Sequence, residues 1–274
     1  MKTFIVPIDF SETSVNAARF AVKLAADSGN VSLILYNSYE KIRSGSDGTP
    51  LFNDPDARKK IAEVALESVK TELLTIEKVR IECVAEQGDF VDNIEAFIKH
   101  HGIEMVIMGI TGSTPLEQIV IGSNTLNIIE RNICPVLIIP PGSKYHGIKN
   151  VVFASDFKEV ERTTPIQPIK SFLGLVRPTL HVANVDHEHY VELTEDYKKE
   201  RNKLEGMLAP FKPEFYFIRL YDFVETISQF AEDKNIDVII TVPRKHSFIT
   251  GLFKTSNTKK LAYHSHVPIL AIHE

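Results

Sequence analysis

Continuous apolar runs alternate along the chain with stretches in which apolar residues recur every three or four positions. Residues 3–8 are a continuous apolar run, which predicts a strand buried on both faces. Ser11 suits an N-cap and Gly29 suits a helix stop, so we expect a helix between them. The same alternation predicts further elements in the first half at 31–36, 56–76, 79–84, 90–101, 105–109, 123–131 and 136–139.

The second half of the chain repeats this pattern. With a shift of 133 residues, 13 of 54 positions in 86–139 are identical to their counterparts in 219–272, among them the triplet Ser123-Asn124-Thr125. With a shift of 147, the first strand and its Asp-Phe ending match residues 152–157. The second copy therefore has predicted elements at 150–155, 163–174, 178–184, 194–208, 214–219, 223–234, 237–242, 256–264 and 268–272.

Buried strands that alternate with helices predict an α/β fold, in which each copy is a doubly wound, parallel, five-stranded sheet with helices on both faces. The first copy carries additional polar residues at 37–56, rich in Gly, Ser, Asp and Pro, which we interpret as a long loop. A turn-rich linker at 140–147 separates the copies. We place the domains at 1–144 and 145–274.

Composition narrows the class of protein. Of the 274 residues 43% are hydrophobic, which is ordinary for a soluble chain, and the net charge of −5 does not favour nucleic acid or anionic lipid as a partner. The apolar runs are far shorter than the roughly 18 residues of a membrane span, and no secretory signal is visible. Two cysteines exclude a disulfide scaffold and favour a reducing compartment. We therefore expect a cytoplasmic protein.

A spaced glycine pattern follows the fourth predicted strand: G-x2-G-x9-G-S, formed by Gly109, Gly112, Gly122 and Ser123. Such a loop, which ends at the start of a helix, can cradle phosphates through backbone N–H groups and through the hydroxyls of Ser113 and Ser123. Asp9 ends the first strand at the same edge of the sheet. Its carboxylate can accept from ribose hydroxyls or hold a divalent cation that bridges phosphates.

Three stretches carry a resemblance to a known family: 5–14 (IVPIDFSETS), 106–113 (VIMGITGS) and 135–139 (PVLII). With the glycine pattern, they resemble the universal stress protein family, and the resemblance extends over both copies. It implies a Rossmann-like fold, pairing of the domains along their last strands, and bound ATP. By position it implies ATP contacts from Ile8, Asp9, Asn37, Met108, Gly109, Thr111, Gly112, Ser113, Gly122, Ser123 and Asn124.

The second copy departs from this pattern. The three glycines of the pattern in the first copy correspond to Val242, Lys245 and Thr255 in the second copy, and Tyr221 replaces Gly88. The β-branched side chains of Val242 and Thr255 stand where backbone would meet phosphate. We predict that the second copy has lost ATP binding and serves as a structural partner, although basic residues there leave weak anion binding open.

Other chemistries have weaker support. The segment 251–255 lacks the glycines of a Walker A loop, and the turn after the first strand lacks the dinucleotide fingerprint. The His-x-His pairs at 187–189 and 264–266, with His181, are candidate ligands of a metal ion, but such pairs in loops are more often solvent-exposed. We assign adjacent His100 and His101 to helix capping, and we expect Cys83 and Cys134 to be inert.

We expect an ATP-binding stress-response protein that acts as a nucleotide-dependent sensor or regulator for an unknown protein partner, with ATP and Mg²⁺ as its ligands. No catalytic residue is assigned because no dedicated general base is visible, and Asp9 is the candidate to hold Mg²⁺ through the nucleotide. Two alternatives stay open: a slow ATPase or self-phosphorylating protein, and a nucleotide-free dimerisation scaffold. A homodimer could form through the apolar final strands or through the domain faces.

Overall fold

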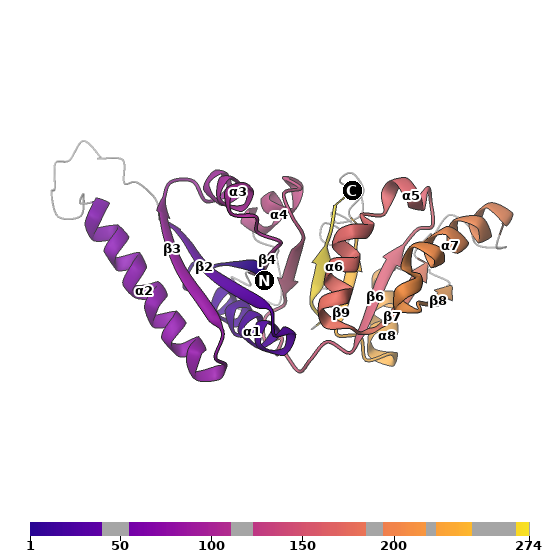
Figure 1. Cartoon of the computed structure of the whole chain (residues 1–274), viewed down its shortest axis with the longest axis horizontal. Helices are drawn as coiled ribbons and strands as arrows, with labels where there is room; N and C mark the ends of the chain where they lie inside the picture. The colour runs from indigo at the N-terminus through magenta and orange to yellow at the C-terminus, as the bar shows by residue number, and fades with distance from the viewer. Residues whose placement is uncertain (40–54, 111–122, 185–193, 218–222, 243–266, 274) are drawn as a thin grey trace.

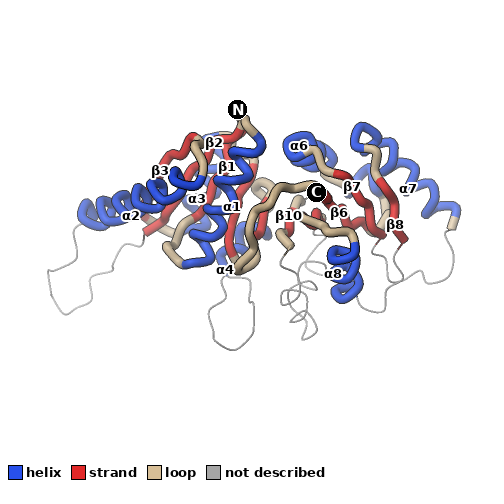
Figure 2. The backbone as a smooth tube through the Cα atoms, turned by 90° about the horizontal axis from the view of Figure 1, so that it is seen from below, coloured by secondary structure: helices blue, strands red, loops and turns tan. Residues whose placement is uncertain are grey.

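In the computed structural model the strands form one ten-stranded sheet, with helices on both of its faces (Figure 1, Figure 2). The structure describes residues 1–39, 55–110, 123–184, 194–217, 223–242 and 267–273. The expected helix at 256–264 and the greater part of the long loop expected at 37–56 lie outside these residues.

The two halves of the sheet have the same internal strand order. The strand order is β3-β2-β1-β4-β5-β10-β9-β6-β7-β8, and the strands within each half run parallel. The strands of the first half are β1 (Lys2–Pro7), β2 (Val31–Tyr39), β3 (Arg80–Gln87), β4 (Met105–Gly109) and β5 (Val136–Ile139). Those of the second half are β6 (Asn150–Ser155), β7 (Thr179–Asn184), β8 (Glu214–Phe217), β9 (Val238–Thr241) and β10 (Ile269–Ala271). The doubly wound parallel architecture of both copies is confirmed.

The final strands of the two copies join the halves. β5 and β10 pair antiparallel, with Leu137 opposite Leu270. The pairing along the last strands that the resemblance implied is therefore made within one chain. Each of these strands already has a neighbour on both sides, so a homodimer through the final strands would require one of them to leave its place.

Helices cover the two faces of the sheet in separate groups. The first core cluster contains residues of α1 (Glu12–Ser28), α2 (Pro55–Ile76), α5 (Val160–Thr163), α6 (Ile166–Val176) and α7 (Glu195–Leu208), the last followed by the short 3₁₀ helix Ala209–Phe211. The second cluster contains residues of α3 (Phe90–His101), α4 (Ser123–Glu130) and α8 (Phe223–Asp233). The first cluster continues from the first half through Tyr145 and Ile148 into the second half, so the halves share a core.

Local signals that the sequence predicted are present at the ends of α1. The hydroxyl of Ser11 accepts from the backbone N–H of Ser14 at 3.2 Å, and Gly29 closes the helix in the left-handed conformation with φ +69°.

The second copy differs from the prediction at the helix expected over 163–174. The expected helix is present as α6, which begins at Ile166, and a further short helix, α5, precedes it; the two are separated at Thr164-Pro165. Proline disfavours a helical conformation in the residue before it, and Thr164 accordingly lies in the extended region (φ −101°, ψ 112°). The first helix of the repeat is therefore continuous in the first copy and interrupted in the second.

The connection between the copies runs from the end of β5 at Ile139 to the start of β6 at Asn150. The boundary that we place between residues 144 and 145 falls within it and stays a prediction. Among the described residues, none of the helices has the length and apolar character that crossing a membrane requires.

Candidate functional site

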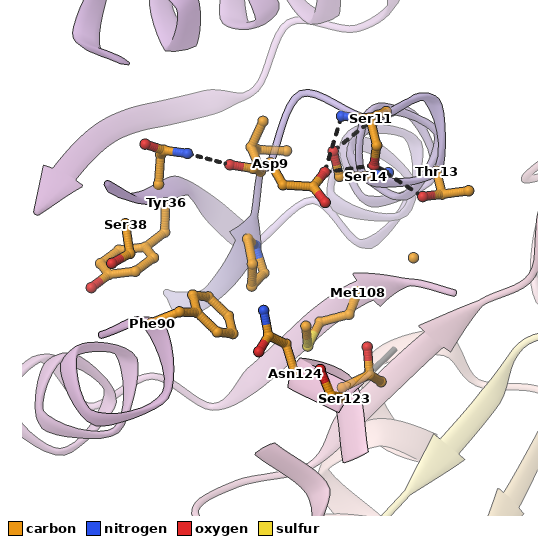
Figure 3. Close-up of a pocket in the computed structure, with 15 residues that line it drawn as sticks. Asp9, Ser11, Thr13, Ser14, Tyr36, Ser38, Phe90, Met108, Ser123 and Asn124 are labelled. Atoms are coloured by element: carbon orange, nitrogen blue, oxygen red, sulfur yellow. Dashed lines mark hydrogen bonds between the residues drawn. The ribbon is translucent and has the colours of Figure 1, made fainter. Parts of the chain in front are cut away.

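A pocket of about 280 Å³ lies at the carboxyl ends of β1, β2 and β4. Residues at the starts of α1, α3 and α4 complete its wall, so the positive ends of three helix dipoles approach it. Since β1 lies between β2 and β4, this is the point at which the strand order of a doubly wound sheet reverses and ligands commonly bind. Figure 3 shows Asp9, Ser11 and Ser14 grouped at the start of α1, across the pocket from Met108, Ser123 and Asn124.

The structure brings together all the predicted site residues that it describes. Seven of them line this pocket: Ile8, Asp9, Asn37, Met108, Gly109, Ser123 and Asn124. The other four, Thr111, Gly112, Ser113 and Gly122, lie outside the described residues. Their shared location is a structural finding, whereas contact with a nucleotide remains a prediction.

Asp9 is held against the start of α1. Its Oδ1 accepts from the backbone N–H of Ser11 at 3.0 Å and from the Ser11 hydroxyl at 2.5 Å. Partial burial would raise the pKa of Asp9, but hydrogen bonds from Ser11 and Ser14 outweigh burial and hold this pKa below its ordinary value. The side chain is therefore an ionised acceptor at neutral pH.

Gly109 is required by packing. A Cβ at this position would lie 2.3 Å from the carbonyl oxygen of Thr13 and 2.7 Å from its carbonyl carbon. Both distances are shorter than real Cβ atoms show. The first turn of α1 therefore rests on the end of β4, and this contact sets the position of the hydroxyls at the pocket.

The pocket has one apolar portion and one polar portion. Ile8 and Met108 are buried, and with Pro7 and Phe90 they provide an apolar surface of the size that suits a ring system. Hydroxyl, amide and carboxylate groups line the remainder: Asp9, Ser11, Thr13, Ser14, Asn37, Ser38, Ser123, Asn124 and Thr125. This division suits a ligand with a planar apolar part and a polar or anionic part.

Asn37 is buried and braces two strands. Its side-chain N–H donates to the backbone carbonyl of Ile8 at 2.7 Å. The second copy has the corresponding pair, Asn184 and Ser155, at 3.5 Å. This hydrogen bond recurs in a domain without the glycine pattern, so it serves the fold. The side-chain oxygen of Asn37 is the other polar group that the side chain could offer to a ligand.

Sequence reasoning did not assign several residues of the pocket wall. They are Pro7, Ser11, Thr13, Ser14, Tyr36, Ser38, Phe90 and Thr125. The stretch Ser11–Ser14 had a visible role as a cap, and its nearness to Asp9 could have placed it at the edge. Tyr36 is fully buried and donates to Glu86 at 2.7 Å, and burial and that carboxylate raise its pKa.

In the described part of the second domain, aromatic side chains pack together beyond the carboxyl end of β6. Phe157, the counterpart of Phe10, is 1% exposed and packs with ring centroids 5.6, 6.0 and 5.9 Å from Tyr197, Phe215 and Phe217. Phe10 makes the same turn, with φ +65° against +53°, but is 41% exposed. The backbone N–H of Val160, at the start of α5, donates to the Glu200 carboxylate at 2.8 Å. A protein carboxylate therefore already occupies a helix N-terminus at this edge.

The model of the universal stress protein family matches residues 1–140 and 175–273. The chain belongs to the universal stress protein family. A universal stress protein of Methanocaldococcus jannaschii is 27% identical over 149 residues, which are 52% of this chain and 84% of that protein. One of Bacillus subtilis is 26% identical over 144 residues, 49% of this chain and 96% of that protein.

A solved universal stress protein from Archaeoglobus fulgidus matches the chain along its length. It covers 99% of this chain and 98% of its own, with a TM-score of 0.73 at 18% identity, a likeness that shows the fold. Between the two matched regions of the universal stress protein model lie residues 141–174, which include β6, α5 and most of α6. The segment that the family model does not match thus contains the interrupted first helix of the second domain.

The remaining candidate groups are the histidines and the two cysteines, of which only some lie in the described part of the chain. There, no three His, Cys, Asp or Glu side chains are placed to hold a metal ion, and the His-x-His pairs at 187–189 and 264–266 fall outside it. His100 and His101 contact the carbonyls of Ala96 and Phe97 through Nδ1, in the last turns of α3. Burial raises the pKa of both the Cys83 and the Cys134 thiols to about 12, which is unfavourable for thiolate chemistry.

Proposed function

We propose that this universal stress protein binds ATP with Mg²⁺ in the pocket of its first domain and acts as a nucleotide-dependent sensor or regulator in the cytoplasm. The observation that carries the proposal is the pocket at the strand-order reversal, where an apolar portion adjoins an ionised carboxylate, several hydroxyls and the starts of three helices. Each of these parts matches a part of a nucleotide, namely base, ribose and phosphates.

The residues present fit such a ligand. A base can lie against Phe90 and Met108, because both line the pocket and Met108 is buried beneath it. Asp9 can accept from ribose hydroxyls or from water bound to Mg²⁺, since its carboxylate is ionised at neutral pH. Ser123 and Asn124, in the first turn of α4, offer a polar surface to the phosphates. When bound, Mg²⁺ would neutralise part of the phosphate charge.

We propose one nucleotide per chain. In the described residues of the second domain, the aromatic cluster around Phe157 and the Val160–Glu200 contact occupy part of the corresponding carboxyl edge. The replacement of Gly109 by Val242 also supports the loss of nucleotide binding in the second domain. The second domain would then act as a partner that reads the state of the first.

The test is to denature purified protein and to identify and count the released small molecules by chromatography and mass spectrometry. Emptied protein is then titrated calorimetrically with Mg-ATP. We expect one ATP per chain in both measurements. Two per chain would refute the loss of the second site, and an empty protein that binds no Mg-ATP would refute ATP binding altogether.

The self-phosphorylation alternative can be tested directly, because serine hydroxyls lie near the proposed position of the phosphates. Intact-mass measurement after incubation with Mg-ATP would show a covalent phosphate adduct if Ser113 or Ser123 were the acceptor. ADP released at one per chain from freshly purified protein would favour slow hydrolysis. ATP released intact, without an adduct, would favour the sensor.

A further inference from the structure

The connection between the two domains lies along α1 and is bound to it. The side-chain amide of Asn16 donates to the carbonyl of Ser143 at 3.2 Å and lies 3.5 Å from that of Pro140. Tyr145 packs edge-on against Phe20, with ring centroids 5.0 Å apart and an interplanar angle of 89°. Its hydroxyl donates to Asp27 at 2.6 Å. We call residues 140–149 the strap.

The far end of the strap is bound to the second domain. Backbone N–H groups of Lys149 and Asn150 donate to one carboxylate oxygen of Asp237, at 2.7 and 2.9 Å. The carbonyl of Lys149 accepts from Thr179 at 2.7 Å, at the start of β7. Ile148 is buried in the core cluster that both domains share. The strap is therefore attached at both ends and differs from a flexible linker.

The same helix forms part of the pocket wall. Thr13 and Ser14, in the first turn of α1, line the pocket, and Asn16 lies in the next turn. The first turn also rests on the backbone of Gly109. A ligand that touches this turn therefore acts on the helix that holds the strap through Asn16, Phe20 and Asp27.

The second copy shows that the start of this helix can take another form in the same fold. There the helix is interrupted at Thr164-Pro165, and Val242 replaces the glycine on which α1 rests. The contact between the helix start and the fourth strand of the repeat therefore differs between the two domains.

We propose that α1 and the strap transmit occupancy of the pocket to the second domain. This inference rests on the proposed function, and it adds how the site would be read. Bound nucleotide stabilises the first turn of α1, the helix holds Asn16 and Tyr145 in place, and the strap in turn holds the start of β6 through Asp237. The effect is a lower rate of local opening at the strap and at β6, both outside the pocket.

The test is amide hydrogen exchange of the full-length chain with and without Mg-ATP. The amides of Lys149 and Asn150 are suitable reporters because both are hydrogen-bonded and neither lies at the pocket. We expect saturating Mg-ATP to slow exchange in 143–152 by at least about fivefold, the lower end of ordinary coupling between sites. Protection confined to the pocket elements would overturn the inference while leaving the proposed function intact, whereas an absence of Mg-ATP binding would remove both.

A variant separates transmission from general stabilisation. In Asn16→Ala/Tyr145→Phe the strap loses its side-chain hydrogen bonds to α1 but keeps the aromatic packing on Phe20. Neither residue lines the pocket, so Mg-ATP should still protect the pocket elements, but protection of 143–152 should fall to less than about twofold. Asn202→Ala, at an exposed position on α7, should behave as wild type. Full protection of the strap in the double variant, or failure of wild type to show any, would refute transmission by this route.

Discussion

A Cβ on Gly109 would lie 2.3 Å from the carbonyl oxygen of Thr13. The glycine ends β4 and the threonine lies in the first turn of α1, so the contact joins two sides of the proposed nucleotide pocket. The obstacle is backbone, which cannot turn aside as a flexible side chain would. The shape of the pocket therefore depends on this glycine even before a ligand arrives.

Gly109→Ala should lower the free energy of unfolding by about 1–3 kcal/mol, because the first turn of α1 must move away from β4. Mg-ATP binding should weaken as well, since the same movement displaces Thr13 and Ser14. Denaturant unfolding and calorimetric titration measure the two effects. Gly206→Ala is the matched control: this exposed helix position has open space around it, so stability should stay unchanged or rise by up to about 1 kcal/mol. An equal response of the two variants would refute the packing role of Gly109.

Asp9→Asn should weaken Mg-ATP binding by about tenfold or more, which corresponds to the loss of one hydrogen bond to an ionised acceptor. The amide oxygen can still accept from Ser11, so the turn before α1 should persist. Asp156→Asn is the matched control, because Asp156 accepts from the backbone N–H of Lys158 at 3.1 Å in the corresponding turn of the second domain. Calorimetry on both variants tests the assignment, and unchanged or tighter binding by Asp9→Asn would exclude Asp9 as a favourable contact.

The two phenylalanines that follow these aspartates should differ in their effect on stability. Phe157→Ala removes a fully buried ring from the aromatic cluster and should cost about 3–5 kcal/mol of unfolding free energy. Phe10→Ala removes a partly exposed ring from the same backbone turn and should cost about 1 kcal/mol or less. Denaturant titrations of both variants measure the difference. A similar cost for both would show that the second-domain edge is not filled as the packing indicates.

The pattern of apolar positions was sufficient to predict nearly all of the described fold. Each buried strand is a short apolar run, and each cap at the ends of α1 is marked by one residue, Ser11 or Gly29. The internal repeat predicted strands in the second copy that correspond to those of the first, and the two halves of the sheet also share one strand order. The short helix α5 and the break after it were missed because Val160 is the one apolar residue of α5, although Pro165 was visible and acts through the backbone of its neighbour.

The site was predictable to a lesser extent, for a physical reason. Asp9 and Gly109 could be assigned to one edge, because parallel strands end at the same edge of a sheet, and both line the pocket. Met108 and Asn124 were assigned to the site through the resemblance to the family, and they line the same pocket. Which groups turn inward depends on helix starts, and this is why Thr13, Ser14 and Phe90 were missed. The packing role of Gly109 was missed as well, because its distance to the backbone of α1 cannot be read from the local sequence, while its contact with a nucleotide stays a prediction.

The second domain should lose stability in mildly acidic solution because of His181. This side chain is 5% exposed on β7, and its Nδ1 has no hydrogen-bond partner in the described part of the chain. Burial lowers its pKa; Glu214, with an oxygen 3.4 Å from Nδ1, opposes the shift and Lys234 adds to it. Because the folded-state pKa lies below the ordinary 6.5, the unfolded chain takes up the proton more readily. The stabilisation is therefore complete above pH 6.5 and is lost as the pH falls through the folded-state pKa.

His181→Ile tests this directly, because isoleucine occupies the corresponding position of the first domain, Ile34 on β2. We expect the denaturation midpoint of the wild type to fall between pH 7.5 and 5 and the variant to show a clearly smaller fall. Part of the dependence should remain, since burial also lowers the pKa of His273. His100→Ala, at an exposed position on α3, should keep the wild-type dependence. If His181→Ile follows the wild-type curve, proton uptake at His181 is not what destabilises the second domain in acid.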